Sequence, residues 1–261
     1  MDFGAFIVKA IVRGVSSSYE KALASFFGSG PTNLEEAKEQ HSAYVSKLRE
    51  LGLIVRELDS HPDYPDCCFV EDHAIVAGDS ALITNAGHDS RLGEKGAIIE
   101  ALEGDLKLEY MTSGGRMDGG DVFQFGNKFL VGHSSRTNRQ GIQNLKDFVE
   151  FRGFDLHVVE VPKSSLHLIS VCTSPMPGVL LVPEGWFKST DFPEGIEILL
   201  VPSEEAYGTN VISFGNDVMV SKGYKKTSQI LIEKGLNLHY MEMSQFRAGD
   251  GSLTCLSVIY E

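Results

Sequence analysis

One cysteine stands where an enzyme would hold a nucleophile. Cys255 follows a glycine-containing turn at residues 250–251 and precedes the apolar residues 258–260, so we expect a last strand over residues 253–260 with the thiol at its entrance. A thiolate at such a position can attack an electrophilic carbon. The alternative is that Cys255 is only a packing residue, because cysteine is among the most buried residue types. The polar residues elsewhere in the chain decide between the two interpretations.

Acidic residues interrupt two segments that otherwise have the composition of buried strands. Asp66, Glu71 and Asp72 fall in the first segment, and Asp118 opens the second, residues 117–123. Burying a carboxylate is costly unless a cation or a full set of hydrogen bonds compensates its charge. If both segments point their first residues into one channel, they form an acidic pocket for a planar cation. A guanidinium fits this description, because its N–H groups bind carboxylates in a bidentate manner.

Two arginines and one histidine lie in loops beside predicted hairpins. Arg91 and Arg136 each follow a hairpin, and equivalent positions in successive repeats would converge into a fork for a carboxylate. His167 stands between two leucines at the start of another hairpin. Taken singly, each arginine is more typical of a solvated surface residue, and the histidine of a satisfied core residue. Their chemistry therefore depends on whether the fold brings these loops together.

Glycines recur along the chain in front of short apolar strands. They are Gly52, Gly104, Gly153, Gly195 and Gly235, at spacings of 52, 49, 42 and 40 residues. The strands are expected at residues 53–58, 106–111, 154–161, 196–201 and 236–241. A helix-like segment precedes every one of these glycines except Gly195, so we expect the other four to be left-handed residues that end a helix.

The helix before Gly52 has the clearest pattern. Apolar residues from Leu34 to Leu51 recur three and four positions apart, and Asn33 with Glu36 resembles a capping box. One face of this helix is therefore expected to pack against the core. Residues 186–190 are too few for more than a turn, and further helices are expected over residues 92–102, 138–151 and 226–234.

Between each of the first four strands and the next helix or turn, two apolar runs flank a tight turn, which predicts a β-hairpin. The unit is therefore ββαβ, and four copies are complete. Residues 6–12 and 253–260 are unpaired strands at opposite ends of the chain, and their pairing would close a ring. We therefore predict an α/β fold, a five-bladed ββαβ propeller with pseudo-fivefold symmetry, as a single domain over residues 1–261. An ordinary open α/β sheet is the alternative. The four turns contain Gly78, Gly126, Gly178 and Gly215.

Composition and charge limit the classes of partner. With 261 residues and 42% hydrophobic content, the chain can form a full core. A formal net charge of -13 argues against nucleic acid or an anionic membrane as a partner, because both bind clustered Lys and Arg. We see no secretory signal and no apolar run of membrane length, so we expect a cytoplasmic protein. The sequence leaves the oligomeric state open, and a homodimer is compatible with it. Reduced thiols are expected at Cys67, Cys68, Cys172 and Cys255, which lack disulfide or zinc spacing.

Together these segments resemble the dimethylarginine dimethylaminohydrolase family, a branch of the guanidine-modifying superfamily. The resemblance runs nearly end to end and implies the five-bladed α/β propeller called the pentein fold, in agreement with the repeat of glycines. It also implies a small arginine derivative as the substrate, and neither a metal nor an organic cofactor. It is carried, in the family's order, by residues 65–72, 117–122, 136–138, 166–168 and 250–257.

The resemblance also implies a role for each candidate residue. Cys255 would be the nucleophile and His167 the general acid and base. Asp118 would join them as a catalytic residue and, with Asp72, would hold the guanidinium. The remaining binding residues would be Glu71 at the guanidinium, Arg91 and Arg136 at the substrate carboxylate, and Asp66 with main-chain carbonyls near Leu23 and Gly249 at the α-amino group.

Two residues depart from the family's pattern. His73 stands directly after Asp72, and Cys68 doubles the cysteine beside the acidic segment. We interpret both as structural, because on an alternating strand His73 would face away from Asp72. Residues 24–33 contain the sequence Gly-Ser-Gly-Pro and suit a mobile lid.

The predicted reaction is the hydrolysis of a methylated arginine to citrulline and an alkylamine through a covalent thiouronium on Cys255. Hydrolysis of arginine or of citrulline would use the same residues, so the sequence leaves these alternatives open. Amidino transfer would need a site for a second amine. A protein that binds arginine or a metal without activity is the last alternative, in which Cys255, His167 and Glu71 could bind zinc.

Overall fold

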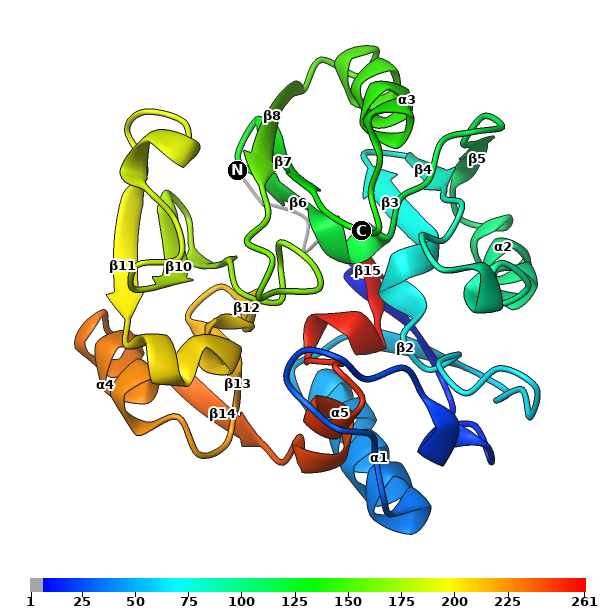
Figure 1. Cartoon of the computed structure of the whole chain (residues 1–261), viewed down its shortest axis with the longest axis horizontal. Helices are drawn as coiled ribbons and strands as arrows, with labels where there is room; N and C mark the ends of the chain where they lie inside the picture. Colours follow the sequence, from blue (N-terminus) through cyan, green and yellow to red (C-terminus); the bar gives the residue numbers. More distant parts are fainter. Residues whose placement is uncertain (1–6) are drawn as a thin grey trace.

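The computed structural model describes residues 7–261, and in them fifteen strands form five sheets of three (Figure 1). Each sheet consists of an antiparallel pair and a third strand that runs parallel to its neighbour. Four sheets follow the chain in order. They are β3 (Ala74–Ala77), β4 (Ser80–Ile83) and β5 (Lys107–Tyr110); β6 (Val122–Phe125), β7 (Lys128–His133) and β8 (Asp155–Glu160); β9 (Thr173–Met176), β10 (Val179–Pro183) and β11 (Glu197–Val201); and β12 (Ile212–Phe214), β13 (Asp217–Ser221) and β14 (Asn237–Met241).

The fifth sheet joins the two ends of the described chain. β1 (Lys9–Arg13) pairs in parallel with β2 (Ile54–Leu58) and antiparallel with β15 (Val258–Tyr260), with Lys9 opposite Tyr260. The predicted pairing of the first and last strands is therefore confirmed, although residue 6 of the predicted first strand lies outside the described residues. The five-bladed propeller is confirmed, and the alternative of one open sheet is wrong.

Helices connect the second and third strands in four of the five blades. Figure 1 shows them toward the outside of the ring. In the remaining blade, a short 3-10 turn, η5 (Ser189–Asp191), takes the helix's place, as the length of that segment predicted. The helices are α1 (Leu34–Glu50), α2 (Gly96–Leu102), α3 (Arg139–Glu150) and α4 (Lys225–Glu233), and a fifth, α5 (Ser244–Ala248), precedes the C-terminal turn.

Three of the four predicted left-handed glycines are confirmed, but α2 begins at Gly96 rather than at residue 92. The Asn33 side chain accepts the N–H of Glu36 at 3.1 Å and caps α1. The capping box of α1 is only half formed, because the N–H of Asn33 donates to Gln245 rather than to Glu36. Gly52 is left-handed with φ 93°, and Gly153 and Gly235 behave in the same way. Gly104 is not among the left-handed residues, so its prediction is wrong. The reason is that the N–H groups of residues 105 and 106 both bond to the carbonyl of residue 102, which ends α2 in a right-handed turn.

Short 3-10 turns stand where the sequence predicted the starts of strands. η2 (Val70–His73) precedes β3, η4 (Gly119–Asp121) precedes β6, and η7 (Thr254–Leu256) precedes β15. The predicted last strand over residues 253–260 is therefore too long, because bonds of the i+3 type at residues 253–257 turn the chain before β15 begins. The acidic residues and Cys255 thus lie on turns at the same end of three inner strands.

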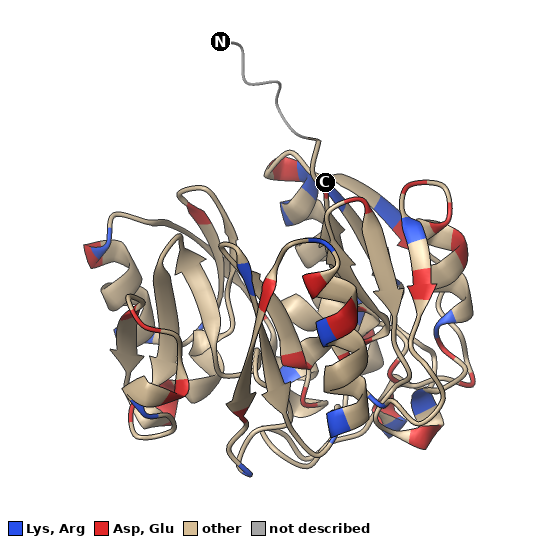
Figure 2. Cartoon of the chain, turned by 90° about the horizontal axis from the view of Figure 1, so that it is seen from above, with Lys and Arg blue, Asp and Glu red and all other residues tan. Residues whose placement is uncertain are grey.

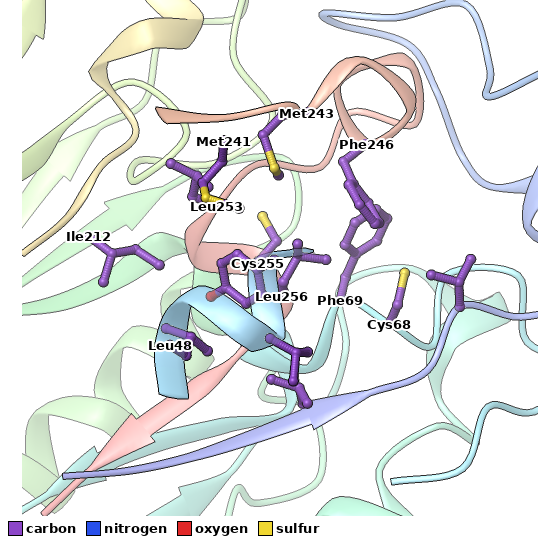
Figure 3. Close-up of a cluster of buried hydrophobic side chains, with 14 of the residues drawn as sticks. Leu48, Cys68, Phe69, Ile212, Met241, Met243, Phe246, Leu253, Cys255 and Leu256 are labelled. Carbon is purple, nitrogen blue, oxygen red and sulfur yellow. The ribbon is translucent and has the colours of Figure 1, made fainter. Parts of the chain in front are cut away.

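Apolar side chains hold the C-terminal turn in place (Figure 3). Leu253 and Leu256 are fully buried on either side of Cys255, in a cluster that also contains Leu48 of α1 and Phe246 of α5. Charged residues of both signs lie mainly on the helices and loops (Figure 2). No helix in the described part of the chain is long and apolar enough to span a membrane.

The two conformations of Gly52 and Gly104 can be compared directly. A Cβ would meet no atom within 4 Å at either glycine, so only the backbone conformation distinguishes them. We expect Gly52→Ala to lower the free energy of unfolding by about 1 kcal/mol or more, because a left-handed alanine is strained. Gly104→Ala should instead leave it unchanged or raise it by about 0.5 kcal/mol. Denaturant unfolding measures both, and equal losses would contradict the helix ends described above.

Candidate active site

A small cavity of about 30 Å³ lies at the C-terminal turn. Its wall includes Cys255 and His167, together with two arginines and two aspartates from other blades. Asp118 lies directly behind His167, and Glu71 lies next to Asp72. The fold therefore gathers all the predicted site residues in one region. Those in the cavity wall are Leu23, Asp66, Asp72, Arg91, Arg136, His167, Gly249 and Cys255.

His167 and Asp118 form a buried pair. The Nε2 atom of His167 lies 3.0 Å from Oδ2 of Asp118, and both side chains are almost inaccessible to solvent. Burial alone would lower the pKa of His167, but the carboxylates of Asp72, Asp118 and Asp121 raise it to about 9. Burial likewise opposes ionisation of Asp118, yet its hydrogen bond and charge interaction with His167 lower the pKa of that carboxyl. The pair is therefore an imidazolium and a carboxylate at neutral pH.

Asp121 is a buried residue for which the sequence suggested no role. Its Oδ2 accepts the hydroxyls of Ser134 and Thr137 at 2.5 and 2.6 Å, and its Oδ1 accepts the N–H of Leu168 at 2.9 Å. Burial raises the pKa of Asp121 to about 6. Asp121 therefore fixes the loop that carries His167. Its signal in the sequence was a second aspartate at the start of an apolar strand.

Glycine allows the acidic turns to approach His167. A Cβ on Gly120 would lie 2.6 Å from Nδ1 of His167 and 3.0 Å from Oδ1 of Asp72. The N–H of Gly120 donates to the same Asp72 oxygen at 3.0 Å. Any larger residue at this position would push the imidazole and the carboxylate apart.

Cys255 is protonated in this environment. Its side chain is almost fully buried, and its Sγ lies 3.3 Å from the hydroxyl of Ser252. Burial raises the pKa of the thiol, and the carboxyls of Glu71 and Asp72 raise it further. A cation placed beside the thiol would reverse the second effect.

Glu71 lies between Cys255 and a second, larger cavity of about 390 Å³. The Thr254 hydroxyl donates to its Oε2 at 3.0 Å, and burial together with Asp72 raises the pKa of Glu71 to about 8. The larger cavity is lined by Glu71 and Thr254 but by neither Cys255 nor His167. The chemistry therefore belongs to the smaller cavity.

Arg91 is tied to the acidic residues around it. Its guanidinium donates to Asp72, to Oε2 of Glu94 at 2.8 Å, and to the carbonyl of Phe69 at 2.8 Å. Glu94 also lies 2.9 Å from Nε2 of His73. The premise that His73 faces away from the site on a strand is wrong, because residues 70–73 form a 3-10 turn and His73 belongs to the buried cluster of Arg91 and Glu94. No pattern in the sequence indicated the role of Glu94.

The second arginine of the predicted fork is more accessible. Arg136 lines the cavity and its side chain is 14% exposed, whereas that of Arg91 is 4% exposed. Its Nη1 lies 3.4 Å from Oδ2 of Asp118. The binding of a substrate carboxylate by these two arginines stays a prediction.

Asp66 and Leu23 meet at the edge of the cavity. Oδ1 of Asp66 accepts the N–H of Leu23 at 3.1 Å. Burial raises the pKa of Asp66 to about 6, and Arg91 opposes the rise. This contact leaves the carbonyl of Leu23 available, as that of Gly249 is.

The site contains one group of donors close enough for a metal ion among residues 7–261. Atoms of Asp72, Asp118 and His167 lie within 4.8 Å of one another. These donors are engaged by protein groups, because His167 bonds to Asp118, and Arg91 bonds to Asp72. The group is not the Cys255, His167 and Glu71 set of the zinc hypothesis.

Propellers of five ββαβ blades with a cysteine, a histidine and carboxylates at their centre form the guanidine-modifying class of enzymes, and the fold and site place this chain in that class. A family model described as N,N dimethylarginine dimethylhydrolase, eukaryotic, matches residues 18–184. The chain belongs to the dimethylarginine dimethylaminohydrolase family.

Relatives and solved structures agree with this membership. The dimethylarginine dimethylaminohydrolase of Streptomyces coelicolor is 32% identical over 252 residues, which cover 96% of each chain. A mutant of the Pseudomonas aeruginosa enzyme, solved in complex with citrulline, is 29% identical with a TM-score of 0.90 over 98% of this chain and 100% of that one. The N-terminal domain of a cyanobacterial arginine dihydrolase has a TM-score of 0.86 over 97% of each chain, at 15% identity, which shows the fold alone.

The charge of the buried pair predicts how stability depends on pH. The pKa of His167 rises from 6.5 to about 9 on folding, so the pair stabilises the fold fully below pH 6.5 and this contribution is lost as the pH rises through 9. The difference in free energy of unfolding between the wild type and His167→Gln should therefore fall by about 3 kcal/mol across this range. Urea unfolding at several pH values measures it.

The free energies of unfolding of the two proteins are compared with each other because Glu71, with a pKa of about 8, also loses its proton between pH 6.5 and 9. Both proteins contain Glu71, so the part of its contribution that is independent of His167 cancels. A difference that stays constant from pH 6.5 to 9 would contradict the imidazolium and carboxylate pair.

Proposed function

We propose that this protein hydrolyses asymmetric dimethylarginine and monomethylarginine to citrulline and an alkylamine. The observation that carries the proposal is that Cys255, Asp72 and the His167–Asp118 pair surround one small cavity. Membership of the dimethylarginine dimethylaminohydrolase family supports the choice of substrate. The substrate is a free amino acid with a guanidinium at one end.

The first step is the activation of the thiol. In the resting site, burial and the two neighbouring carboxyls keep Cys255 protonated. A bound guanidinium would bring a positive charge beside the sulfur, which stabilises the thiolate and lets the proton pass to solvent. The site would therefore form its nucleophile only when the substrate is present.

Asp72 would orient the guanidinium for attack. Its oxygens already accept bonds from Arg91 and from the N–H of Gly120. Each carboxylate oxygen has two lone pairs, so Asp72 can also accept N–H groups of the substrate. The thiolate then attacks the central carbon of the guanidinium and forms a tetrahedral adduct.

His167 would control both proton transfers. As the adduct collapses, the imidazolium gives its proton to the departing nitrogen, the C–N bond breaks and the alkylamine leaves a thiouronium on Cys255. The neutral His167 then takes a proton from water, which attacks the same carbon. As this second adduct collapses, its hydroxyl loses a proton to solvent, the C–S bond breaks, and citrulline leaves with the thiolate restored. Asp118 holds the imidazole in place through both steps.

The amino acid end of the substrate would bind at the opposite side of the cavity. We assign its carboxylate to Arg136 and Arg91, with the more exposed Arg136 as the first contact. Its α-amino group would bind to Asp66 and to the carbonyls of Leu23 and Gly249, which line the cavity. Glu71 would support the guanidinium from behind. A cytoplasmic location stays a prediction.

The proposal is tested by product analysis with purified protein. Asymmetric dimethylarginine, monomethylarginine, arginine and citrulline are offered in parallel, and citrulline, dimethylamine, methylamine and ammonia are quantified. We expect citrulline with dimethylamine or methylamine. Ammonia from arginine or citrulline alone would overturn the choice of substrate.

The nucleophile is tested with a pair of cysteine variants. Cys255→Ser should lower kcat by at least about a thousandfold, because a serine hydroxyl is a far weaker nucleophile here. Cys172→Ala is the matched control, since Cys172 is a buried free cysteine outside the cavity. Retained activity in Cys255→Ser would contradict the mechanism.

A further inference from the structure

Residues 24–33, which we call the strap, are fastened to the C-terminal turn beside the cavity. The Asp250 carboxylate accepts the N–H groups of four consecutive strap residues, those of Phe26, Phe27 and Gly28 at 2.9, 2.7 and 3.0 Å, and that of Ser25. Further along, the N–H of Gly30 donates to the carbonyl of residue 248 at 2.8 Å. The first part of the strap is therefore held mainly by one side chain.

The far end of the strap is held separately. Oε1 of Gln245 accepts the N–H groups of Thr32 and Asn33, each at 3.1 Å. A Cβ on Gly28 would lie 2.1 Å from the carbonyl oxygen of Ala248, so this approach requires glycine. Helix α5 and the turn after it thus form the surface on which the strap lies.

Asp250 adopts an unusual backbone conformation to make these bonds. Its φ of 58° is the only positive value at a non-glycine residue in the described chain. Such a conformation costs roughly 1 kcal/mol or more and persists where surrounding contacts impose it. Asp250 is also buried, and no basic side chain forms an ion pair with it among residues 7–261. The four N–H groups therefore balance its charge.

The cavity beside the fastened strap is too small for a substrate. The cavity of about 30 Å³ has room for one or two water molecules, whereas a site for a ligand of arginine's size needs about 300 Å³ or more. Leu23, directly before the strap, and Gly249 to Gly251 both belong to its wall. For an amino acid to enter, Leu23 must therefore move away from residues 249–251, and the bonds from the strap to Asp250 hold these two segments together.

We propose that Asp250 is a positioning residue that fastens the strap over the bound amino acid end of the substrate. Closure would bring the carbonyls of Leu23 and Gly249 to the α-amino group. The inference rests on the proposed function for the identity of the substrate. It assigns to Asp250 a part in substrate affinity and none in the bond-breaking steps.

Substitution can remove the carboxylate of Asp250 while residue 250 keeps its positive φ. Asp250→Asn and Asp250→Gly both tolerate a positive φ, but neither offers two oxygen acceptors to the strap. Gly28→Ala disturbs the same contact from the strap side without changing Asp250. Asp147→Asn is the matched control, because it removes the same charge from an exposed position on α3.

The first measurement needs no substrate. Hydrogen exchange at residues 25–28 should become faster by at least about tenfold in Asp250→Asn, Asp250→Gly and Gly28→Ala, because charge-assisted bonds are lost. Alkylation of Cys255 by iodoacetamide should become faster in the same variants, and neither rate should change in Asp147→Asn. Unchanged exchange at residues 25–28 in both Asp250 variants would overturn the proposal.

The second measurement separates affinity from chemistry. With methylarginine as the substrate, KM should rise by about tenfold or more in both Asp250 variants, while kcat changes by less than about threefold, because contacts of the closed strap act equally before and during the reaction. A lower kcat with an unchanged KM would overturn the proposal and place Asp250 with Cys255. If the wild type released no product from any methylarginine, the proposed function would fail, while hydrogen exchange would still test the fastening.

Discussion

Buried negative charge is the constraint on which the centre of this protein depends. Asp72 in the cavity wall and Asp118 and Asp121 outside it are all buried, and a carboxylate without compensation would not remain ionised there. His167 supplies one positive charge and Arg91 supplies another, while hydroxyl and N–H groups satisfy the remaining oxygens. Burial, together with Glu71 and Asp72, raises the pKa of Cys255 and suppresses its thiolate until a cation arrives. A positively charged guanidinium would therefore complement the carboxylates of the resting site.

The propeller provides this arrangement because its blades repeat. A 3-10 turn before the inner strand of three blades places Asp72, Asp121 and Cys255 at the same end of the ring, and glycine at residue 120 allows the turns to touch. Asp121 fixes the loop that carries His167 by accepting the N–H of Leu168. On the other side, Asp250 holds the strap beside the cavity, on the turn that leads to Cys255.

The sequence predicted what local patterns encode. Hairpin turns, helix ends and the pairing of the two end strands follow from glycine positions and apolar periodicity, which act within a few residues or at every repeat. It failed at Gly104, where competing bonds to residue 102 end the helix, and at Cys255, where a turn replaces a strand. It gave no role to Asp121, Glu94 or Asp250, because their partners lie in other parts of the chain. Only the three-dimensional structure shows which groups form hydrogen bonds with these carboxylates.

The most direct test of the account is mass spectrometry of the protein quenched in acid during turnover of asymmetric dimethylarginine. We expect an adduct on the peptide that contains Cys255, with the mass of the substrate less dimethylamine. The adduct should be absent from the peptides that contain Cys67, Cys68 and Cys172. Steady production of citrulline without any adduct on Cys255, under conditions in which the thiouronium should accumulate, would contradict covalent catalysis at the centre of the propeller.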